Sequence, residues 1–253
     1  EEESRGGWRA RKRREKEWGR KDRQMRTEMD LGRMRLKWVC LLVLVWFGSG
    51  EVTVEMDNLV HEVALDAGFA TPIDVDWIPG EVTRMIVCEK SGVIHLAING
   101  VLQSKPFLDI SNRVVSLGGR GLISCIIDTQ FKKHPFLYVQ YVDRRLNTSE
   151  DGVKSGKIVR FRVSKDLTRA FGQVVLIGKQ VPPATGCGLN ESIFSKDVIC
   201  LDSKHHNMGG LAMSPSGNMF IALGDAQAPP DFEDTAFRTQ DLEFMGGKVL
   251  CIT

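Results

Sequence analysis

The chain has 253 residues, of which 42% are hydrophobic and 26% charged, and these values are ordinary for a globular protein. The charge is uneven, since residues 1–37 carry 14 basic and 8 acidic side chains and the rest carry 20 basic and 24 acidic ones. The part that can fold is therefore mildly acidic. It shows no basic run with interleaved aromatic residues, which argues against nucleic acid as a partner.

Residues 1–33 form a head of mixed charge with few apolar side chains, a composition that cannot bury enough surface to fold alone. Its basic run fits a nucleic-acid or nuclear-import segment, and it equally fits a solvated tail. The chain begins at Glu1, and its first methionines are Met25, Met29 and Met34. We interpret residues 1–33 as a disordered basic head or as sequence upstream of the translated start.

A short hydrophobic segment follows Met34. Basic residues precede ten apolar residues from Trp38 to Phe47, and the small residues Gly48-Ser49-Gly50 come next. This order is typical of a secretory signal peptide over 34–50, although a buried core helix or strand is equally hydrophobic. Ten apolar residues are too few to span a bilayer, which needs about 20. The sequence predicts a secreted protein that starts near Glu51 and has no stable membrane span.

Removal of residues 34–50 takes Cys40 away and leaves an odd number of cysteines: Cys88, Cys125, Cys187, Cys200 and Cys251. Disulfides are expected in an oxidising compartment. Cys187 and Cys200 flank a 12-residue loop segment and are the best candidate pair. No cysteine or histidine spacing indicates a zinc site. Sequons at Asn147 and Asn190 are predicted glycosylation sites, as an exported protein would carry.

The rest of the chain is a series of short apolar runs bounded by turn residues, with no amphipathic helix evident after residue 50. The runs are 72–80, 84–92, 93–100, 121–129, 136–143, 157–164, 173–178, 211–217, 219–225 and 248–253. Many closely spaced short strands are typical of an all-β sandwich, barrel or propeller. A strand–turn–strand pattern that starts near residues 73, 123 and 211 favours the propeller, because its first interval approaches the length of one blade.

Four separated stretches resemble, in order, the glucose/sorbosone dehydrogenase family. They are AGFATPIDVDWIPGEVTRMIVCEKSGVIHLAING, PFLDISNRVVSLGGRGLISCIIDTQFKKHPFLYVQYV, KHHNMGGLAMSPSGNMFIALGD and GGKVLCI. The family has a six-bladed β-propeller and includes quinoprotein sugar dehydrogenases that use pyrroloquinoline quinone (PQQ) with calcium. It also includes the propeller of Hedgehog-interacting protein. The resemblance spans about residues 61–252 and implies an incomplete propeller, about half of the six blades, within residues 51–253.

The resemblance also implies individual site residues. Pro215 lies nine residues after His206, which places His206 at the family's catalytic base. Oxidation of an aldose at C1 needs a base for the hydroxyl proton, and imidazole, with a pKa near 6.5, suits that task. His205, Arg120 and Asp225 are the implied cofactor-binding residues, and a carboxylate such as Asp225 also suits calcium. From the residues alone, His206 is a working base, a vestigial one or a structural histidine in a turn.

The sequence departs from the pattern of the sugar dehydrogenases in four places, one of which is Cys251, at the arginine of their final Lys-x-Leu-Arg motif. His205 stands where they have a carboxylate before the base, residues 118–121 lack their glutamine, and residues 226–229 replace their Arg-Asn pair. Two functions therefore stay open. One is PQQ- and calcium-dependent oxidation of aldose sugars. The other is a non-catalytic extracellular propeller that binds a protein or glycan ligand, similar to Hedgehog-interacting protein.

Overall fold

A computed structural model describes residue 65 and residues 67–144, 148–180, 182, 187, 197–226 and 239–253. The predictions for the head, the signal peptide, Asn147 and Asn190 lie outside the described residues. All the elements below belong to one compact unit, Val63–Thr253. The described residues are almost entirely strand and loop, with a short 3-10 helix η1 (Ser111–Arg113), and none of them forms a helix with the length and apolarity to cross a membrane.

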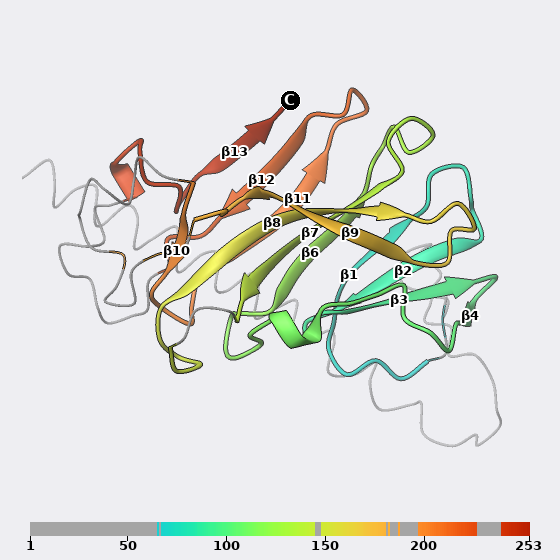
Figure 1. Cartoon of the computed structure of the whole chain (residues 1–253), viewed down its shortest axis with the longest axis horizontal. Coiled ribbons are helices and arrows are strands. Elements are labelled where there is room, and N and C mark those ends of the chain that lie inside the picture. The colour runs from blue at the N-terminus through green and yellow to red at the C-terminus, as the bar shows by residue number, and fades with distance from the viewer. Residues whose placement is uncertain are drawn as a thin grey trace, which may run out of the picture. The chain divides into compact units, whose positions relative to one another are not determined.

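The strands form three antiparallel sheets (Figure 1). The first contains β1 (Pro72–Trp77), β2 (Arg84–Glu89), β3 (Val93–Ile98) and β4 (Val101–Leu102), with β5 (Leu108–Asp109) beside β3. The second contains β6 (Leu122–Ile127), β7 (Phe136–Asp143) and β8 (Lys154–Val163), with β9 (Ala170–Ile177) and β10 (Ile199–Leu201) beside β8. The third contains β11 (Met208–Met213), β12 (Met219–Leu223) and β13 (Val249–Ile252). The predicted all-β fold is confirmed.

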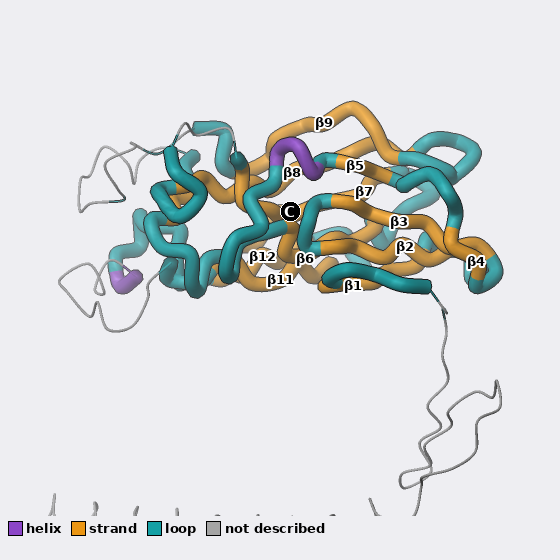
Figure 2. Tube along the Cα trace, turned by 90° about the horizontal axis from the view of Figure 1, so that it is seen from below, coloured by secondary structure: helices purple, strands orange, loops and turns teal. Residues whose placement is uncertain are grey.

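The first strand of each sheet lies beside the first strand of the next. β6 contacts β1 on one side and β11 on the other, and Figure 2 shows the three strands near one another. Consecutive sheets joined at their first strands are the arrangement of blades around the axis of a β-propeller. The chain therefore forms an incomplete propeller, as expected.

Hydrogen bonds from side chains connect β1, β6 and β11, since these strands share no backbone ladder. Asp74 Oδ2 accepts hydrogen bonds from Ser124 Oγ (2.8 Å) and from the Cys125 N–H (3.1 Å). Asp76 Oδ2 accepts one from the N–H of Ile127 (2.7 Å). Ser124 Oγ also accepts the N–H of Leu211 on β11 (3.2 Å), so one serine joins all three sheets. These contacts satisfy backbone donors that would otherwise be buried without partners.

Two apolar layers separate the sheets. One layer lies between the first and second sheets and includes Ile86, Ile94, Leu137 and Phe161. The other lies between the second and third sheets and includes Val142, Ile158, Ile221 and Leu223. Successive residues of a strand face opposite sides, so the second sheet needs apolar side chains at nearly every position. Its strands accordingly contain near-continuous apolar runs such as LISCII and FLYV.

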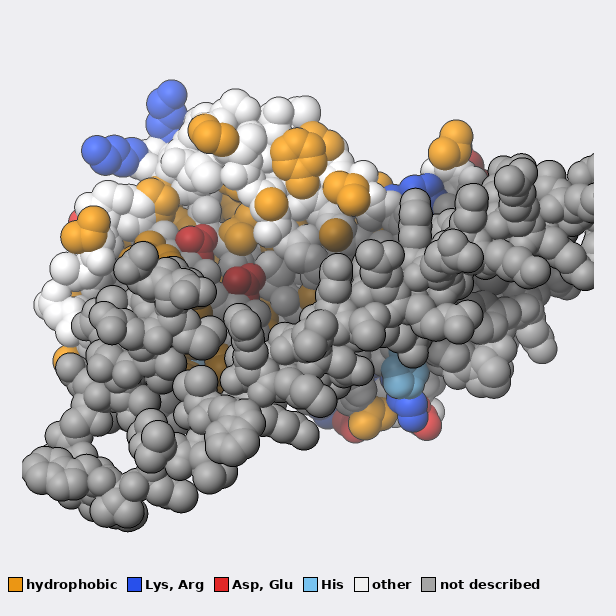
Figure 3. All heavy atoms as spheres, turned by 180° about the vertical axis from the view of Figure 1, so that it is seen from behind, with side chains coloured by type: hydrophobic (Ala, Val, Ile, Leu, Met, Phe, Trp, Pro, Cys, Tyr) orange, Lys and Arg blue, Asp and Glu red, His pale blue; other side chains and the backbone are white. Residues whose placement is uncertain are grey.

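The outer faces of the first and third sheets carry exposed apolar side chains, which are Ile73, Val75 and Trp77 on β1, Phe220 on β12 and Val249 on β13. Figure 3 shows the molecule from behind, with several hydrophobic side chains open on that side. On each strand these residues alternate with side chains that face the second sheet, such as Asp74 and Asp76, so they point away from it.

Two disulfides lie among the described cysteines. The predicted pair Cys187–Cys200 is confirmed, with its Cα atoms 5.7 Å apart. Cys88 on β2 is bonded to Cys125 on β6, which cross-links the first and second sheets within their shared core. Cys251 is free and exposed.

Replacement of both Cys88 and Cys125 by alanine should lower the free energy of unfolding by about 4 kcal/mol, because this bridge restricts a long loop in the unfolded chain. The two cysteines are 37 positions apart in the sequence. Urea denaturation followed by circular dichroism measures the change. Cys251→Ser is the control and should unfold as the wild type does. An unchanged midpoint for the double variant would contradict the cross-link.

The Asp76 carboxyl should make stability depend on pH. Burial raises its pKa, while the N–H groups of Ile127 and Trp77 lower it and the charge of Asp74 raises it. A raised pKa means that the folded protein holds this proton more tightly than the unfolded chain. The stabilisation is therefore complete below the ordinary value of 3.8 and is lost as pH rises through the folded pKa.

Asp76→Asn stays neutral at every pH and lacks this dependence. Its free energy of unfolding, measured relative to the wild type by urea denaturation, should therefore rise between about pH 4 and about pH 7. A difference that stays constant, or that falls, over this range would show that Asp76 does not titrate as its burial requires.

Candidate functional site

The segments that lead into the first strands meet at one end of the sheets. The N–H of Gly119, before β6, donates to the carbonyl of Lys204, before β11 (2.7 Å). Lys90, which follows β2, donates from Nζ to the carbonyl of Gly118 (2.5 Å). A Cβ at residue 119 would lie 3.0 Å from the Lys204 carbonyl oxygen. Glycine at this position therefore allows the two segments to touch.

The segment that enters β11 is held against the segment that leaves β12. The carbonyl of His206 accepts the N–H of Ala226 (2.8 Å), and the carbonyl of Asn207 accepts the N–H of Gly224 (3.1 Å). A Cβ at residue 224 would collide with the His206 carbonyl, so only glycine fits there. His206 itself has a φ of 48°, in the left-handed region that few non-glycine residues adopt.

This backbone arrangement brings two of the predicted site residues together. His206 Nδ1 lies 3.4 Å from Asp225 Oδ1, and the two side chains are 61% and 43% exposed. A carboxylate facing Nδ1 favours the tautomer with its proton on that nitrogen, which leaves Nε2 as the basic nitrogen. The pair therefore has the chemistry of a base and the group that orients it. Sequence reasoning placed no carboxylate beside this histidine, because Asp225 lies at the far end of the β11–β12 hairpin.

His205 does not share this arrangement. It is exposed, and its backbone N–H donates to Ser203 Oγ (3.1 Å). Lys204 is exposed as well. Two potential hydrogen-bond donors thus precede His206 on an accessible turn.

Arg120 is buried, with an exposed fraction of 0%. Its guanidinium donates to the backbone carbonyls of Ser203 (3.0 Å), Leu201 (3.4 Å) and Glu150. Burial lowers the pKa of the guanidinium, and the charges of Asp151 and Asp202 act in the opposite direction. Arg120, which the resemblance implied as a cofactor-binding residue, therefore directs its guanidinium at backbone carbonyls. Through its carbonyl contacts Arg120 positions the segment that leads to His205 and His206.

Asn207 is a residue that sequence reasoning missed. Its side chain is 2% exposed, and within the described part of the chain neither its amide nitrogen nor its amide oxygen has a hydrogen-bond partner. Buried polar atoms are normally paired, with protein or with ordered water. The only signal in the sequence was its position next to His206.

The described residues include no group of three or more His, Cys, Asp or Glu side chains that could hold a metal ion. Asp225, the carboxylate considered for calcium, faces His206. Calcium remains a prediction from the family resemblance.

Comparisons with known proteins agree with this fold. The model of the glucose/sorbosone dehydrogenase family matches residues 69–253. Comparison with curated protein sequences gave no match. Similar solved structures include an oxidoreductase described as a glucose dehydrogenase from Thermus thermophilus, with 20% identity and a TM-score of 0.51 over 76% of this chain and 46% of that one.

Two aldose sugar dehydrogenases are also similar. The soluble enzyme from Escherichia coli, in its apo form, has 19% identity and a TM-score of 0.51 over 72% of this chain and 44% of that one. The PQQ-bound enzyme from Streptomyces coelicolor has 15% identity and a TM-score of 0.50 over 74% and 45%. At such identities the likeness shows the fold alone.

The chain spans less than half the length of each of these structures. Its three sheets correspond to an incomplete six-bladed propeller, in agreement with the expectation from sequence. Because the family model covers most of the residues, the chain belongs to the glucose/sorbosone dehydrogenase family.

Proposed function

We propose that this protein takes part in the oxidation of aldose sugars at the C1 hydroxyl, with PQQ as the hydride acceptor. The observation that carries the proposal is the approach of Asp225 Oδ1 to His206 Nδ1 (3.4 Å). Membership of the family and the PQQ-bound structure from Streptomyces coelicolor support the same substrate class and cofactor.

The proposed roles follow from the pair. His206 Nε2 takes the proton of the C1 hydroxyl as the C1–O bond becomes a carbonyl, and the sugar leaves as a lactone. The hydride from C1 needs a two-electron acceptor, which is the chemistry that the quinone supplies when bound. Asp225 accepts the Nδ1–H of His206, which keeps the imidazole in this tautomer, and it stabilises the imidazolium after the proton transfer.

The donors at this end of the sheets fit a cofactor with carboxylate groups. Lys204 and His205 are exposed beside the base, and an ammonium group and an imidazole N–H both donate to carboxylates. Arg120 does not serve in this way, because it is buried and directed to backbone carbonyls. We therefore assign the cofactor contacts to Lys204 and His205, and we derive no step through calcium.

His206→Ala should lower kcat/KM by about 10²- to 10⁴-fold, because a positioned general base contributes about that much. Asp225→Asn should lower it by at least about tenfold, because the imidazole loses its orienting charge. The assay mixes the protein with PQQ, calcium, an electron-accepting dye and a panel of aldoses. Asp109→Asn, which alters an exposed carboxylate on β5, is the matched control and should leave the rate unchanged.

The alternative is a non-catalytic propeller that binds a protein or glycan ligand. The 61% exposure of the His206 side chain favours it, because enzymes usually exclude water from the groups that transfer protons. The same assay separates the two functions. Absence of turnover with every aldose, from a protein whose circular dichroism shows an intact fold, would reject the dehydrogenase and leave the binding protein.

We further propose that the protein is secreted after removal of residues 34–50. The two disulfides support this, because such bonds persist in oxidising compartments. Mass spectrometry of protein from the culture medium should give a mature start near Glu51. Deglycosylation should lower the mass, and Asn147→Gln with Asn190→Gln should abolish that difference. Protein found only inside cells, with residues 34–50 attached, would contradict secretion.

A further inference from the structure

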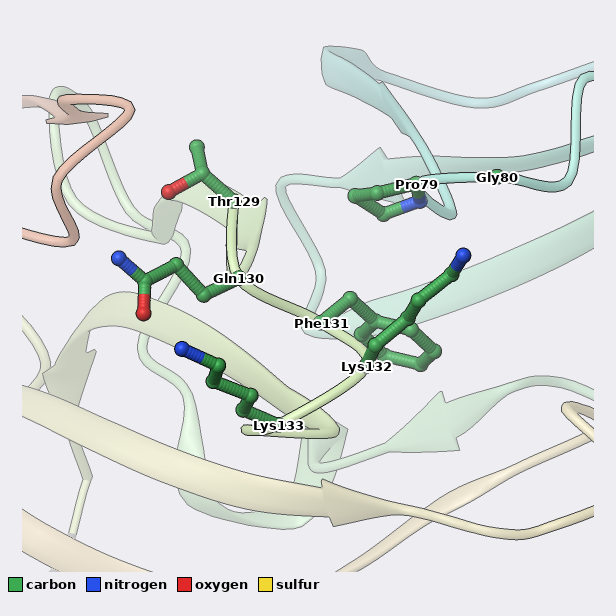
Figure 4. Close-up of a pocket in the computed structure, with 7 residues that line it drawn as sticks. All are labelled: Pro79, Gly80, Thr129, Gln130, Phe131, Lys132 and Lys133. Atoms are coloured by element: carbon green, nitrogen blue, oxygen red, sulfur yellow. The ribbon is translucent and has the colours of Figure 1, made fainter.

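A hollow of about 410 Å³ lies between the β1–β2 and β6–β7 turns (Figure 4). The β1–β2 turn supplies Pro79 and Gly80, and the β6–β7 turn supplies residues 129–133. Both turns follow the first strand of their sheet, whereas His206 precedes β11. Since the first strands lie side by side in the same direction, this hollow is separate from the histidine site.

The hollow combines an apolar base with polar sides. Phe131 is only 8% exposed and belongs to the core between the first and second sheets. Thr129 Oγ1 donates to the carbonyl of Ser214 on the β11–β12 turn (2.8 Å), which holds this side of the hollow in place. Figure 4 shows Lys132 extending toward Pro79 and Gly80, while the Lys133 ammonium lies apart from it, beside Gln130. The two ammonium groups thus lie on different sides of the hollow.

The carboxylate of the β6–β7 turn does not neutralise these lysines. Asp128 is buried and accepts hydrogen bonds from Tyr138 Oη (2.9 Å) and from the N–H of Gln130 (2.8 Å). Asp128 Oδ2, the oxygen that accepts from Tyr138, also lies 3.9 Å from His134 Nδ1. Within the described residues, neither Lys132 nor Lys133 forms an ion pair or a side-chain hydrogen bond. Two exposed positive charges therefore flank the hollow without a counter-charge.

More positive charge lies next to this turn. The Arg160 guanidinium is 4.2 Å from the centre of the Phe136 ring, and that of Arg162 is 5.8 Å from it. His134 stacks on the same ring, with the two ring centres 6.4 Å apart. β7 and β8 pair Phe136 with Arg162, which gathers both arginines and His134 around one ring at the start of the strand that follows the β6–β7 turn. The sequence shows no such cluster, because its members lie about 30 positions apart.

We propose that this hollow binds a linear acidic polysaccharide, with a sugar ring over Phe131 and Pro79 and its sulfate or carboxylate groups on Lys132 and Lys133. Ammonium groups form strong charge-assisted hydrogen bonds with such anions. Cations on different sides of the hollow match a polymer whose negative charges repeat. Arg160 and Arg162 lie beyond the β6–β7 turn, on the other face of the second sheet, where a longer polymer that passes over the turn reaches them. A single small anion would need them to converge on one point.

The aromatic side chains favour a polysaccharide over single-stranded nucleic acid. Nucleic-acid bases need open aromatic faces on which to stack. Phe131 is 8% exposed, and His134 and Arg160 occupy the surroundings of the Phe136 ring. The apolar C–H face of a sugar needs only the shallow apolar base that Phe131 and Pro79 provide. This site is independent of the proposed dehydrogenase activity.

The test uses a heparin hexasaccharide and a hyaluronan hexasaccharide as probes, with neutral cellohexaose beside them. Residues 1–37 are themselves basic, so the readout must be local. Hydrogen–deuterium exchange of the peptides that cover 129–136 and 158–163 serves this purpose. We expect at least one acidic probe to slow exchange in both peptides and cellohexaose to leave exchange unchanged. Protection by heparin alone would show that the hollow requires sulfate groups. Protection by both acidic probes would show that it accepts sulfate and carboxylate groups alike.

Lys132→Gln with Lys133→Gln should raise the probe concentration needed for half-maximal protection by at least about tenfold, whereas Lys132→Arg with Lys133→Arg should retain protection. Lys105→Gln with Lys179→Gln removes the same charge from exposed positions outside the hollow and should behave as the wild type. Three results would overturn the proposal: no protection by either acidic probe, equal loss in the control variant, or stronger protection by an oligodeoxythymidylate.

Discussion

The structure depends on how the first strands of neighbouring sheets meet. β1, β6 and β11 lie side by side without a shared ladder, so their inward N–H groups need side-chain acceptors. Asp74, Asp76 and Ser124 supply these acceptors, and Ser124 serves two interfaces at once. Carboxylates that accept backbone N–H groups are partly removed from water, and burial raises the pKa of Asp76 as a consequence. The same contacts hold the three first strands in register and in one direction.

A shared strand direction gives the sheets two chemically different ends. At the end where first strands begin, glycines at 119 and 224 allow backbone segments to touch and bring His206 to Asp225. At the end where first strands finish, the turns are short, and they carry Lys132 and Lys133 without a counter-charge. Arg120 contributes to the first end from within, because its guanidinium binds the carbonyls of the chain that leads to His205. The functional groups at each end are therefore carried by turns, and the register of the strands sets where those turns lie.

Features set by local patterns could be predicted from the sequence, and features set by long-range pairing could not. Short apolar runs between turn residues predicted the strands, and the close spacing of Cys187 and Cys200 predicted their bond. Cys88 and Cys125 are 37 positions apart and meet only through packing of two sheets. The burial of Arg120 was missed for the same reason, since its carbonyl partners lie 30 to 83 positions away. The basic cluster around Phe136 likewise forms only when β7 pairs with β8.

The His206–Asp225 pair shows why a missing motif residue is weak evidence against a site. His205 replaces the carboxylate that precedes the base in the sugar dehydrogenases, and by sequence alone this removes the orienting group. In the structure, β12 runs antiparallel to β11, so the end of β12 lies beside the start of β11. Asp225, which follows β12, therefore lies next to His206 Nδ1. Its place is fixed by backbone hydrogen bonds from Ala226 and Gly224 to residues 206 and 207. The approach of Asp225 to His206 therefore depends on Gly224 and on the left-handed backbone of His206. The residue that immediately precedes His206 is not needed for it, so the proposed base keeps a carboxylate partner although His205 differs from the family pattern.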